Sequence, residues 1–303
     1  MDGLADPTGD MPAIQPTRRA AIGVGPAGLR MVIAGYIDGL LDTIAAAEAI
    51  APLGHSLVET GSLETDSLAV IEAGVAAMAD EAICLGAAPP EVAISSAFSR
   101  ADDLNALEDA IIRGGGRTSR VLEPGDEANL TYVGAMAGDP RAPALVVSIG
   151  DHSTELMGGA AHLHWVSSAP CGSLSMTEQF LVGATADLDD LEAMIASARE
   201  VFEPIAAEHP VTAVVGVGRL AATVAMLGGS PRIDLAALGD AAETLAGSDT
   251  ATIAEDLGVE FDNVAQAFAG VAICEAIRRA FGVEFVWVTR QGLEEGLALD
   301  LLA

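Results

Sequence analysis

The chain has 303 residues, of which 51% are hydrophobic, which suits two domains with a substantial core and argues against global disorder. Its 44 acidic residues and 14 basic residues, all of the latter arginine, give a formal net charge of −30. A surface of that charge repels DNA, RNA and anionic membranes, so a nucleic-acid-binding role is nearly excluded.

Cysteine usage and the lack of long apolar runs indicate the compartment. Cys84, Cys171 and Cys274 are odd in number and far apart, which favours reduced thiols over a disulfide framework. No apolar run is long enough to span a membrane, and residues 1–17 lack the apolar core of a signal peptide. We therefore expect a cytoplasmic protein with a disordered leader over residues 1–17 and no membrane partner.

The first half predicts a β-hairpin followed by alternating helices and strands. Strands are expected over 20–24 and 29–37, and the glycine turn 25–28 joins them directly, unlike the strand–loop–helix of a Rossmann or P-loop unit. No element is assigned between 38 and 66. The further elements expected are helices over 67–85, 102–112 and 123–137, and strands over 91–95 and 120–122.

The same opening recurs near residue 144. Strands are expected over 144–149, 154–157 and 160–167, and the turn 150–153 joins the first two. The elements expected after them are helices over 173–182 and 188–207, a strand over 211–215 with a glycine turn and a helix to 226, helices over 233–246 and 262–281, a strand over 283–288 and a helix over 293–302.

Two α/β halves that each begin with a glycine hairpin predict the fold class. We expect an α/β protein with two ribonuclease-H-like (actin-like ATPase) domains that face each other across a cleft. Domain I is predicted over 18–140 and domain II over 141–303, with the boundary near 138–143 and the last helix packing on domain I. Hairpin turns at such a cleft can present backbone N–H groups to phosphate from both sides.

Several short segments, in order, resemble the Ppx/GppA family of exopolyphosphatases and guanosine pentaphosphate phosphohydrolases, of the actin and sugar-kinase superfamily, in a short two-domain form. Residues 20–30 are similar to its first phosphate loop, A-x-I-D-x-G-T-N-S-x-R, and residues 148–156 to its second, D-I-G-G-G-S-T-E-L. The other similar segments are Ser95–Arg100 (T-S-A-x-R), the segment around Glu127 (E-E-A-R-L-x-x-x-G), 168–180, the third glycine turn 214–218 and Gly292–Gly296 (G-L-R-E-G).

The resemblance implies hydrolysis of phosphoanhydrides in polyphosphate or guanosine pentaphosphate, with Mg²⁺ as cofactor if the chain is active and no cofactor otherwise, and we expect a homodimer. Glu127 corresponds to the water-activating base and Glu155 to the acid of the second loop. The implied phosphate-binding set is Gly25, Gly28, Arg100, Gly150, Ser153, Thr154, Gly216 and Gly218. Glu155 and His152 are the candidate metal ligands.

Structural roles stay open beside these functional ones. Glu127 could be a carboxylate that stabilises the start of its helix, and Glu155 an exposed strand residue. The hydroxyl groups of Ser153 and Thr154 could serve hairpin hydrogen bonding, and Arg100 could pair with a neighbouring aspartate.

The departures from the family pattern affect charged groups. Gly23 and Ser148 stand where the two loops have aspartate, and Asn129 and Glu294 stand where the pattern has arginine. Arg219 and Leu220 follow the third glycine turn, where the family often has Gly-Thr. Loss of cation ligands and phosphate donors together predicts weakened or lost catalysis. Three functions follow: a phosphoanhydride hydrolase, a non-catalytic binder of phosphate or nucleotide, and a regulatory partner protein with a vestigial cleft.

Overall fold

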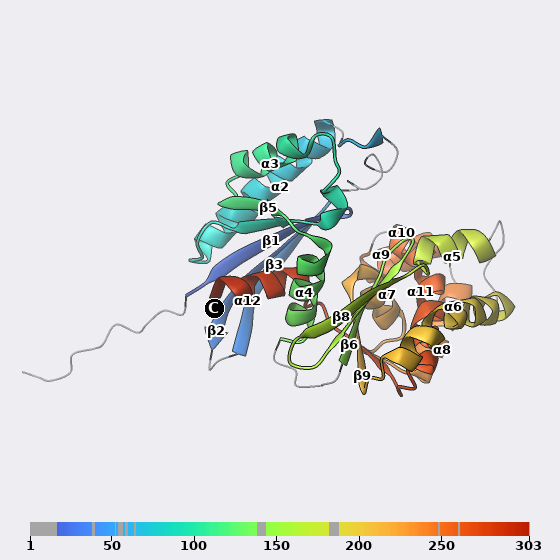
Figure 1. Cartoon of the computed structure of the whole chain (residues 1–303). Helices are drawn as coiled ribbons and strands as arrows, with labels where there is room; N and C mark the ends of the chain where they lie inside the picture. The colour runs from blue at the N-terminus through green and yellow to red at the C-terminus, as the bar shows by residue number, and fades with distance from the viewer. Residues whose placement is uncertain are drawn as a thin grey trace, which may run out of the picture.

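A computed structural model of the chain describes residues 17–37, 40–51, 53, 57, 60–63, 65–137, 144–181, 188–247, 249–259 and 261–302. The predicted boundary at 138–143 lies outside the described residues, as does nearly all of the predicted leader. Two separate sheets, each with its own helices, form an N-terminal unit and a C-terminal unit (Figure 1). This arrangement confirms the predicted fold class.

The N-terminal unit is built on a five-stranded sheet in the order β3-β2-β1-β4-β5. Strands β1 to β3 pair antiparallel, and β4 and β5 continue the sheet in parallel. The elements are β1 (Arg19–Gly25), β2 (Gly28–Ile37), β3 (Leu40–Ile50), α2 (Thr65–Cys84), β4 (Glu91–Ile94), a 3₁₀ turn (Ser96–Phe98), α3 (Leu104–Arg113), β5 (Thr118–Val121) and α4 (Pro124–Ala135).

The C-terminal unit repeats this pattern with one more strand, in the order β10-β11-β9-β6-β7-β8. Strands β6 to β8 pair antiparallel, whereas β9 and β11 continue in parallel. The elements are β6 (Ala144–Ile149), β7 (Thr154–Gly159), β8 (Leu163–Ala169), α5 (Ser173–Phe180), α6 (Leu188–Glu208), β9 (Ala213–Val217), α7 (Gly218–Leu227), β10 (Arg232–Ile233), α8 (Leu235–Gly247), α9 (Thr250–Leu257), α10 (Phe261–Ala265), α11 (Ala267–Ala280), β11 (Val286–Val288) and α12 (Leu293–Leu302).

The structure adds elements that the pattern analysis does not assign. Strand β3 is an alanine-rich segment whose side chains are mostly exposed or half-buried, so it lacks the β-branched alternation that marks a strand. Its pairing with β2 along the whole strand supplies what its own propensity does not. The pattern also does not predict helix α9, and the helix expected over 262–281 is divided at Gln266 into α10 and α11.

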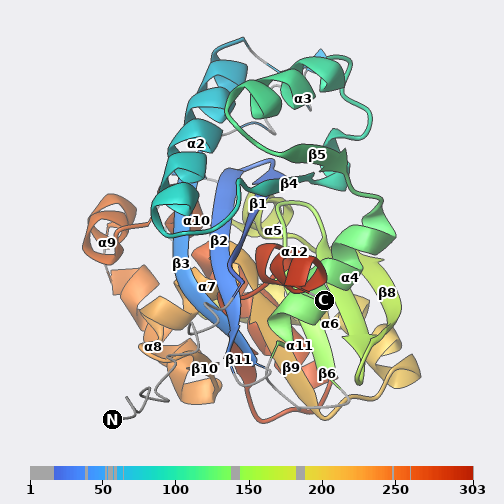
Figure 2. The ribbon, with the colours of Figure 1, turned by 90° about the vertical axis from the view of Figure 1, so that its left-hand side faces the viewer.

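Each unit places one helix against the sheet of the other. Helices α2 and α3 cover one face of the N-terminal sheet, and α12, from the end of the chain, covers the opposite face with Leu297 and Ala298 (Figure 1). Helix α4, from the N-terminal unit, packs Ala128 and Tyr132 against β6, β7 and β9. The two exchanged helices lie side by side at the centre of the molecule (Figure 2).

Backbone contact between α4 and α12 depends on two glycines. A Cβ at Gly134 would lie 1.8 Å from the carbonyl oxygen of Gly292, and a Cβ at Gly296 would lie 1.9 Å from that of Leu130. Real Cβ atoms do not approach oxygen so closely, so glycine at these positions is what allows the two helices to touch.

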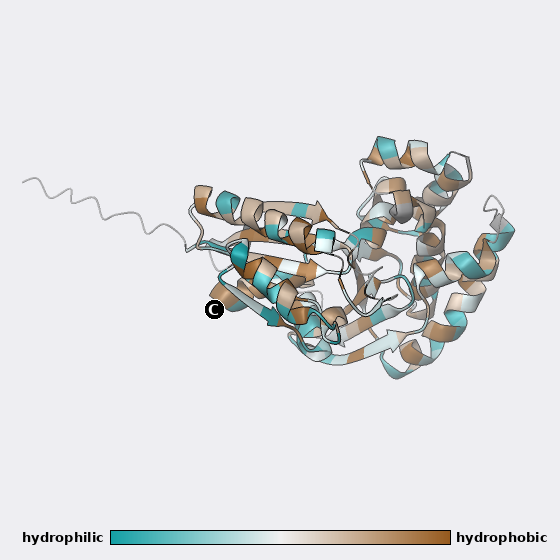
Figure 3. Cartoon of the chain, turned by 90° about the horizontal axis from the view of Figure 1, so that it is seen from above, coloured by the Kyte–Doolittle hydropathy of each residue, from teal (hydrophilic) through white to brown (hydrophobic). Residues whose placement is uncertain are grey.

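Hydrophilic residues recur along the outer helices of both units (Figure 3), and no described helix is long and apolar enough to cross a membrane. With a net charge of −30, repulsion between surface carboxylates opposes the compact state. We expect the midpoint of thermal unfolding to rise as KCl increases from about 0.05 M to about 1 M, where the screening length falls to about 3 Å. Differential scanning calorimetry with matched NaCl samples checks this, and a midpoint that falls with either salt would be inconsistent with it.

Candidate functional site

A cavity of about 930 Å³ lies between the two units. Residues from β2, β3 and α4 line one side, and residues from β9, α7 and the segment leading into α12 line the other. Most of the wall is apolar, formed by Ile50, Ala222, Ala225, Met226, Leu257, Val259 and Leu293. A cavity of this size and character suits a small molecule with an apolar body.

Three arginines line the cavity wall, namely Arg30, Arg219 and Arg290. Arg219 is in the first turn of α7, and its Nη1 donates to the carbonyl oxygen of Ala27, 3.4 Å away in the turn of the first hairpin. It therefore reaches from one unit to the other. Gly218, which precedes it, has a φ of 85°, and this left-handed conformation turns the chain from β9 into α7.

Arg30 is held by carboxylates. Its Nη1 donates to Glu294 at 2.6 Å, and its Nη2 donates to Glu295 at 2.7 Å. Its Nε lies 3.6 Å from Glu48, which also lies 3.5 Å from Arg290. Glu295 is 2% exposed and caps α12 by accepting the N–H of Gly292. This cluster ties β2 and β3 to the start of α12.

The first loop lacks its side-chain phosphate donors, and its glycines serve different purposes. A Cβ at Gly28, whose φ is 131°, would lie 2.2 Å from the carbonyl oxygen of Ala49, so this glycine lets β3 approach the turn. Gly25 has no atom within 4 Å of a Cβ position. Neither glycine lines the cavity, and the Gly25–Gly28 turn meets the cavity through Arg219.

The second loop is anchored to α5. The carbonyl oxygen of Gly150 accepts from the N–H of Ser173, and that of Asp151 accepts from the N–H of Ser175. Thr154 is fully buried, and its hydroxyl donates to the carbonyl oxygen of Cys171. That hydroxyl proton is engaged within the fold, which favours the structural role for Thr154.

Glu155 retains a half-buried carboxylate at this loop. Its Oε1 accepts from the hydroxyl groups of Ser153 at 2.5 Å and Ser168 at 3.3 Å. In the β6–β7 register it lies opposite Ser148, which lines the cavity. The Ser153 hydroxyl is therefore engaged within the protein. The side chains of Ser153, Glu155 and Ser168 form a small polar network beside Gly150.

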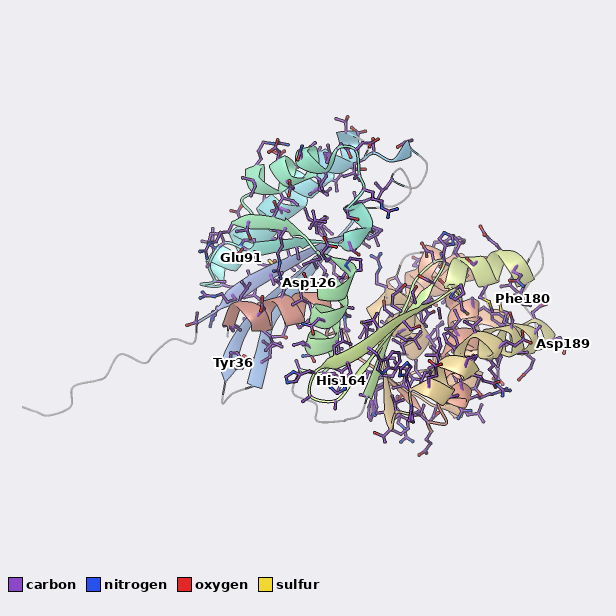
Figure 4. All side chains as sticks on the ribbon, viewed as in Figure 1. Tyr36, Glu91, Asp126, His164, Phe180 and Asp189 are labelled. Atoms are coloured by element: carbon purple, nitrogen blue, oxygen red, sulfur yellow. The ribbon has the colours of Figure 1, made fainter. Side chains whose placement is uncertain are left out.

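Glu127 lies in the first turn of α4, between the two units, where Figure 4 labels its neighbour Asp126. Its Oε2 accepts the backbone N–H of Ser96 at 2.8 Å, just beyond the end of β4. One carboxylate oxygen is therefore fixed by the N-terminal unit. Glu127 is not among the residues that line the cavity, so a role as base needs a ligand that extends beyond that lining.

Three of the other predicted residues lie apart from the cavity lining. Arg100 is exposed after the 3₁₀ turn, and Gly216 packs within β9 against Ala221. His152 is exposed, with its Nδ1 3.0 Å from the hydroxyl of Ser175. Among all the predicted site residues, Gly218 alone lines the cavity, and neither Glu127 nor Glu155 is part of its lining.

A magnesium centre needs oxygen ligands, usually carboxylates together with phosphate oxygens. Among the residues that the structure describes, no three His, Cys, Asp or Glu side chains converge to hold a metal ion. Gly23 and Ser148 stand at the two loop positions that would carry aspartate. This donor set does not fit a magnesium centre of the family's kind, so we derive no step through a metal ion.

Sequence reasoning did not assign the charged residues of the cavity as site residues. Arg219 and Glu294 stand out in the sequence only as departures from the family pattern, and Arg290 has no motif around it. The signal that could have found Arg219 is its place directly after the third glycine turn, at the start of a helix. The pairing of Arg30 with Glu294 joins residues 264 positions apart, which no local pattern reports.

Comparison with known proteins agrees with the fold. A model described as the Ppx/GppA phosphatase family matches residues 110–303. Among solved structures, the type II variant of the Aquifex aeolicus Ppx/GppA phosphatase matches with a TM-score of 0.78 at 22% identity, over 95% of this chain and 100% of that one. An exopolyphosphatase from Cytophaga hutchinsonii matches with a TM-score of 0.78 at 16% identity, over 94% of this chain and 98% of that one.

At these identities the two solved structures show a shared fold alone. A search of curated proteins gave no match. The family match, however, spans more than half of the chain and includes α4, the second loop and α12. It confirms the resemblance seen in the motifs: the chain belongs to the Ppx/GppA phosphatase family.

Proposed function

We propose that this chain binds a phosphorylated nucleotide in the cavity between its units and hydrolyses phosphoanhydrides far more slowly than a complete family site would. The observation that carries the proposal is the cavity itself, which joins an apolar wall to Arg219 and Arg290. The apolar wall suits a nucleoside, and the guanidinium groups suit its phosphates. A long polyphosphate has no apolar part to bury and meets a surface of charge −30.

Slow hydrolysis follows from the groups at the loops. Glu127 is held in place and could orient water, but the loop aspartates are replaced and Arg30 is already paired with carboxylates. Little positive charge is therefore available to stabilise the charge that develops during phosphoryl transfer. If the rate of hydrolysis is zero, the same proposal describes a protein that binds the nucleotide without catalysis.

Replacing Arg219 with alanine should weaken nucleotide binding by about tenfold or more, because a charge-assisted hydrogen bond contributes about 1.5–3 kcal/mol. Isothermal titration calorimetry with guanosine di- and triphosphate measures this. Arg113→Ala is the control, because Arg113 pairs with the exposed Glu72, away from the cavity lining. Equal affinity in the two variants would contradict an arginine-dependent phosphate site.

Hydrolysis is tested by phosphate release from short polyphosphate and guanosine pentaphosphate, first with Mg²⁺ and then with Mn²⁺. We expect turnover well below the range of about 1–10³ per second typical of enzymes, with the residual rate lost in Glu127→Ala. Turnover within that range on polyphosphate would overturn both the nucleotide preference and the slow hydrolysis.

A further inference from the structure

We infer that Glu294 is a specificity-determining residue of the cavity: its carboxylate takes the place of a first-loop side chain, occupies Arg30, and makes the site favour nucleotides of low phosphate charge. This inference rests on the proposed function, because it concerns the ligand of the same cavity. Glu294 stands where the family pattern has arginine and Gly23 where it has aspartate, and the structure brings these two departures together.

The contact between positions 23 and 294 is steric. A Cβ at Gly23 would lie 2.2 Å from Oε1 of Glu294 and 3.1 Å from its Cδ. The Glu294 side chain is 12% exposed and lines the cavity, whereas Gly23 is buried in β1. The carboxylate therefore fills the space into which any side chain at residue 23 would extend. The carboxylate that occupies this space thus comes from α12 instead of β1.

The same carboxylate engages Arg30. In the β1–β2 register Arg30 lies opposite Gly23, so its guanidinium is next to the first loop. All three guanidinium nitrogens are near carboxylates, because Nη1 contacts Glu294, Nη2 contacts Glu295 and Nε lies near Glu48. Arg30 thus brings no net positive charge to a ligand while Glu294 is ionised.

The balance of charge immediately around Arg30 is negative, because Glu48, Glu294 and Glu295 all lie against its guanidinium, whereas Arg219 adds positive charge elsewhere on the cavity wall. Glu294, Glu295 and Glu48 face Arg30 and Arg290, whereas the nearby lining residue from α4, Thr131, is uncharged. Each added phosphate charge here is repelled by Glu294 at close range and in a partly desolvated site. A nucleoside diphosphate should therefore bind in preference to a more highly phosphorylated nucleotide.

Burial of Glu294 makes its carboxylate easier to protonate, and protonation removes its negative charge. Desolvation raises the pKa of the Glu294 carboxyl above its ordinary value, Arg30 opposes the rise, and Glu295 adds to it. An anion placed nearby raises the pKa further. Low pH should thus relieve the repulsion, which predicts that the preference for the diphosphate weakens as pH falls.

Glu294→Gln tests the inference because it keeps the shape of the side chain and removes its charge. By calorimetry in EDTA, we expect the variant to bind guanosine triphosphate about tenfold more tightly than the unmodified protein does, and guanosine diphosphate about threefold more tightly. A purely structural role for Glu294 predicts the opposite sign, since damage to the site weakens binding. Glu91→Gln, on β4 and outside the cavity lining, is the matched control and should change neither affinity.

The outcomes separate the two proposals. If the unmodified protein binds both nucleotides and Glu294→Gln leaves their affinity ratio unchanged, the inference about Glu294 is overturned and the proposed function stands. If neither protein binds either nucleotide, both are overturned. Weaker binding of both nucleotides by the variant also overturns the inference.

A charge exchange provides a measurement that needs no ligand. Gly23→Asp alone should lower the midpoint of thermal unfolding, because its side chain collides with the Glu294 carboxylate and adds a further negative charge beside the buried Glu294 and Glu295. Adding Glu294→Arg should recover most of that loss, because the carboxylate is then on β1 and a cation is on α12. If the shift in the unfolding midpoint of the double variant equals the sum of the two single shifts, the side chains at 23 and 294 do not occupy the same space, and the inference is overturned.

Discussion

Replacing Gly296 with alanine should destabilise the protein by about 3 kcal/mol or more, because the new methyl group has no free space. Its Cβ would lie 1.9 Å from the carbonyl oxygen of Leu130 and 2.7 Å from its carbonyl carbon. These are backbone atoms of α4, which cannot rotate away as a side chain could. Alanine favours a helix over glycine by about 1 kcal/mol, so the collision has to exceed that gain.

Chemical denaturation followed by circular dichroism measures the effect. Gly239→Ala is the control, since Gly239 is an exposed residue of α8 with no atom within 4 Å of a Cβ position. That variant should gain about 0.5–1 kcal/mol from helix propensity alone. If Gly296→Ala were as stable as Gly239→Ala, α4 and α12 would not touch through their backbones.

Replacing Glu275 with alanine should cost about 1.5–3 kcal/mol, because it removes charge-assisted hydrogen bonds from a buried carboxylate, while Arg279 keeps its contact with Glu192 at 3.5 Å. The Glu275 side chain is 3% exposed in α11, where it accepts hydrogen bonds from Arg278 at 2.6 and 2.8 Å and from Arg279 at 2.6 Å. Helix α11 is the central helix of the C-terminal core and packs against α6. An exposed ion pair, Arg199 with Glu203 on α6, provides the control, and Glu203→Ala should cost less than about 1 kcal/mol.

The Glu275 ion pairs also predict a pH dependence. Burial alone would raise the pKa of the Glu275 carboxyl, but the hydrogen bonds from Arg278 and Arg279 outweigh it and hold the pKa below its ordinary value. A carboxyl whose pKa is lowered by folding contributes stability above its unfolded pKa and loses that contribution as pH falls through the folded value. The gap in unfolding free energy between the unmodified protein and Glu275→Gln should therefore shrink in acid. A difference in unfolding free energy that stays constant from about pH 7 to about pH 3 would contradict the lowered pKa of Glu275.

Much of the fold could be predicted because its signals are local. The two glycine hairpins and the apolar strands after them appear directly in the sequence, and their repetition indicates two similar units. Strand β3 is not predicted because its segment is rich in alanine, and only its pairing with β2 identifies it as a strand.

Some residues of the candidate site are likewise predicted by local motifs, whereas the roles of others depend on contacts between distant segments. Gly218 and the neighbourhood of Glu127 follow from motifs, since each lies where an element begins. The roles of Arg219 and Glu294 depend on which distant segment each one meets, Ala27 for the first and Gly23 for the second. The sequence shows both residues as departures, and three-dimensional contact is needed to show that Glu294 compensates for the glycine at 23.

The exchange of helices α4 and α12 between the two sheets has a consequence for biosynthesis. One face of the N-terminal sheet is covered by α12, which the ribosome makes only after the entire C-terminal unit. Until then Leu130 of α4 is, among the described residues, the one helical side chain buried with Ala21, Val32 and Ala93, and the part of that face that Leu297 and Ala298 later cover is exposed. The N-terminal unit is thus translated first but buries this face only after α12 has been made, so we expect its nascent form to expose apolar surface that a holdase chaperone could bind.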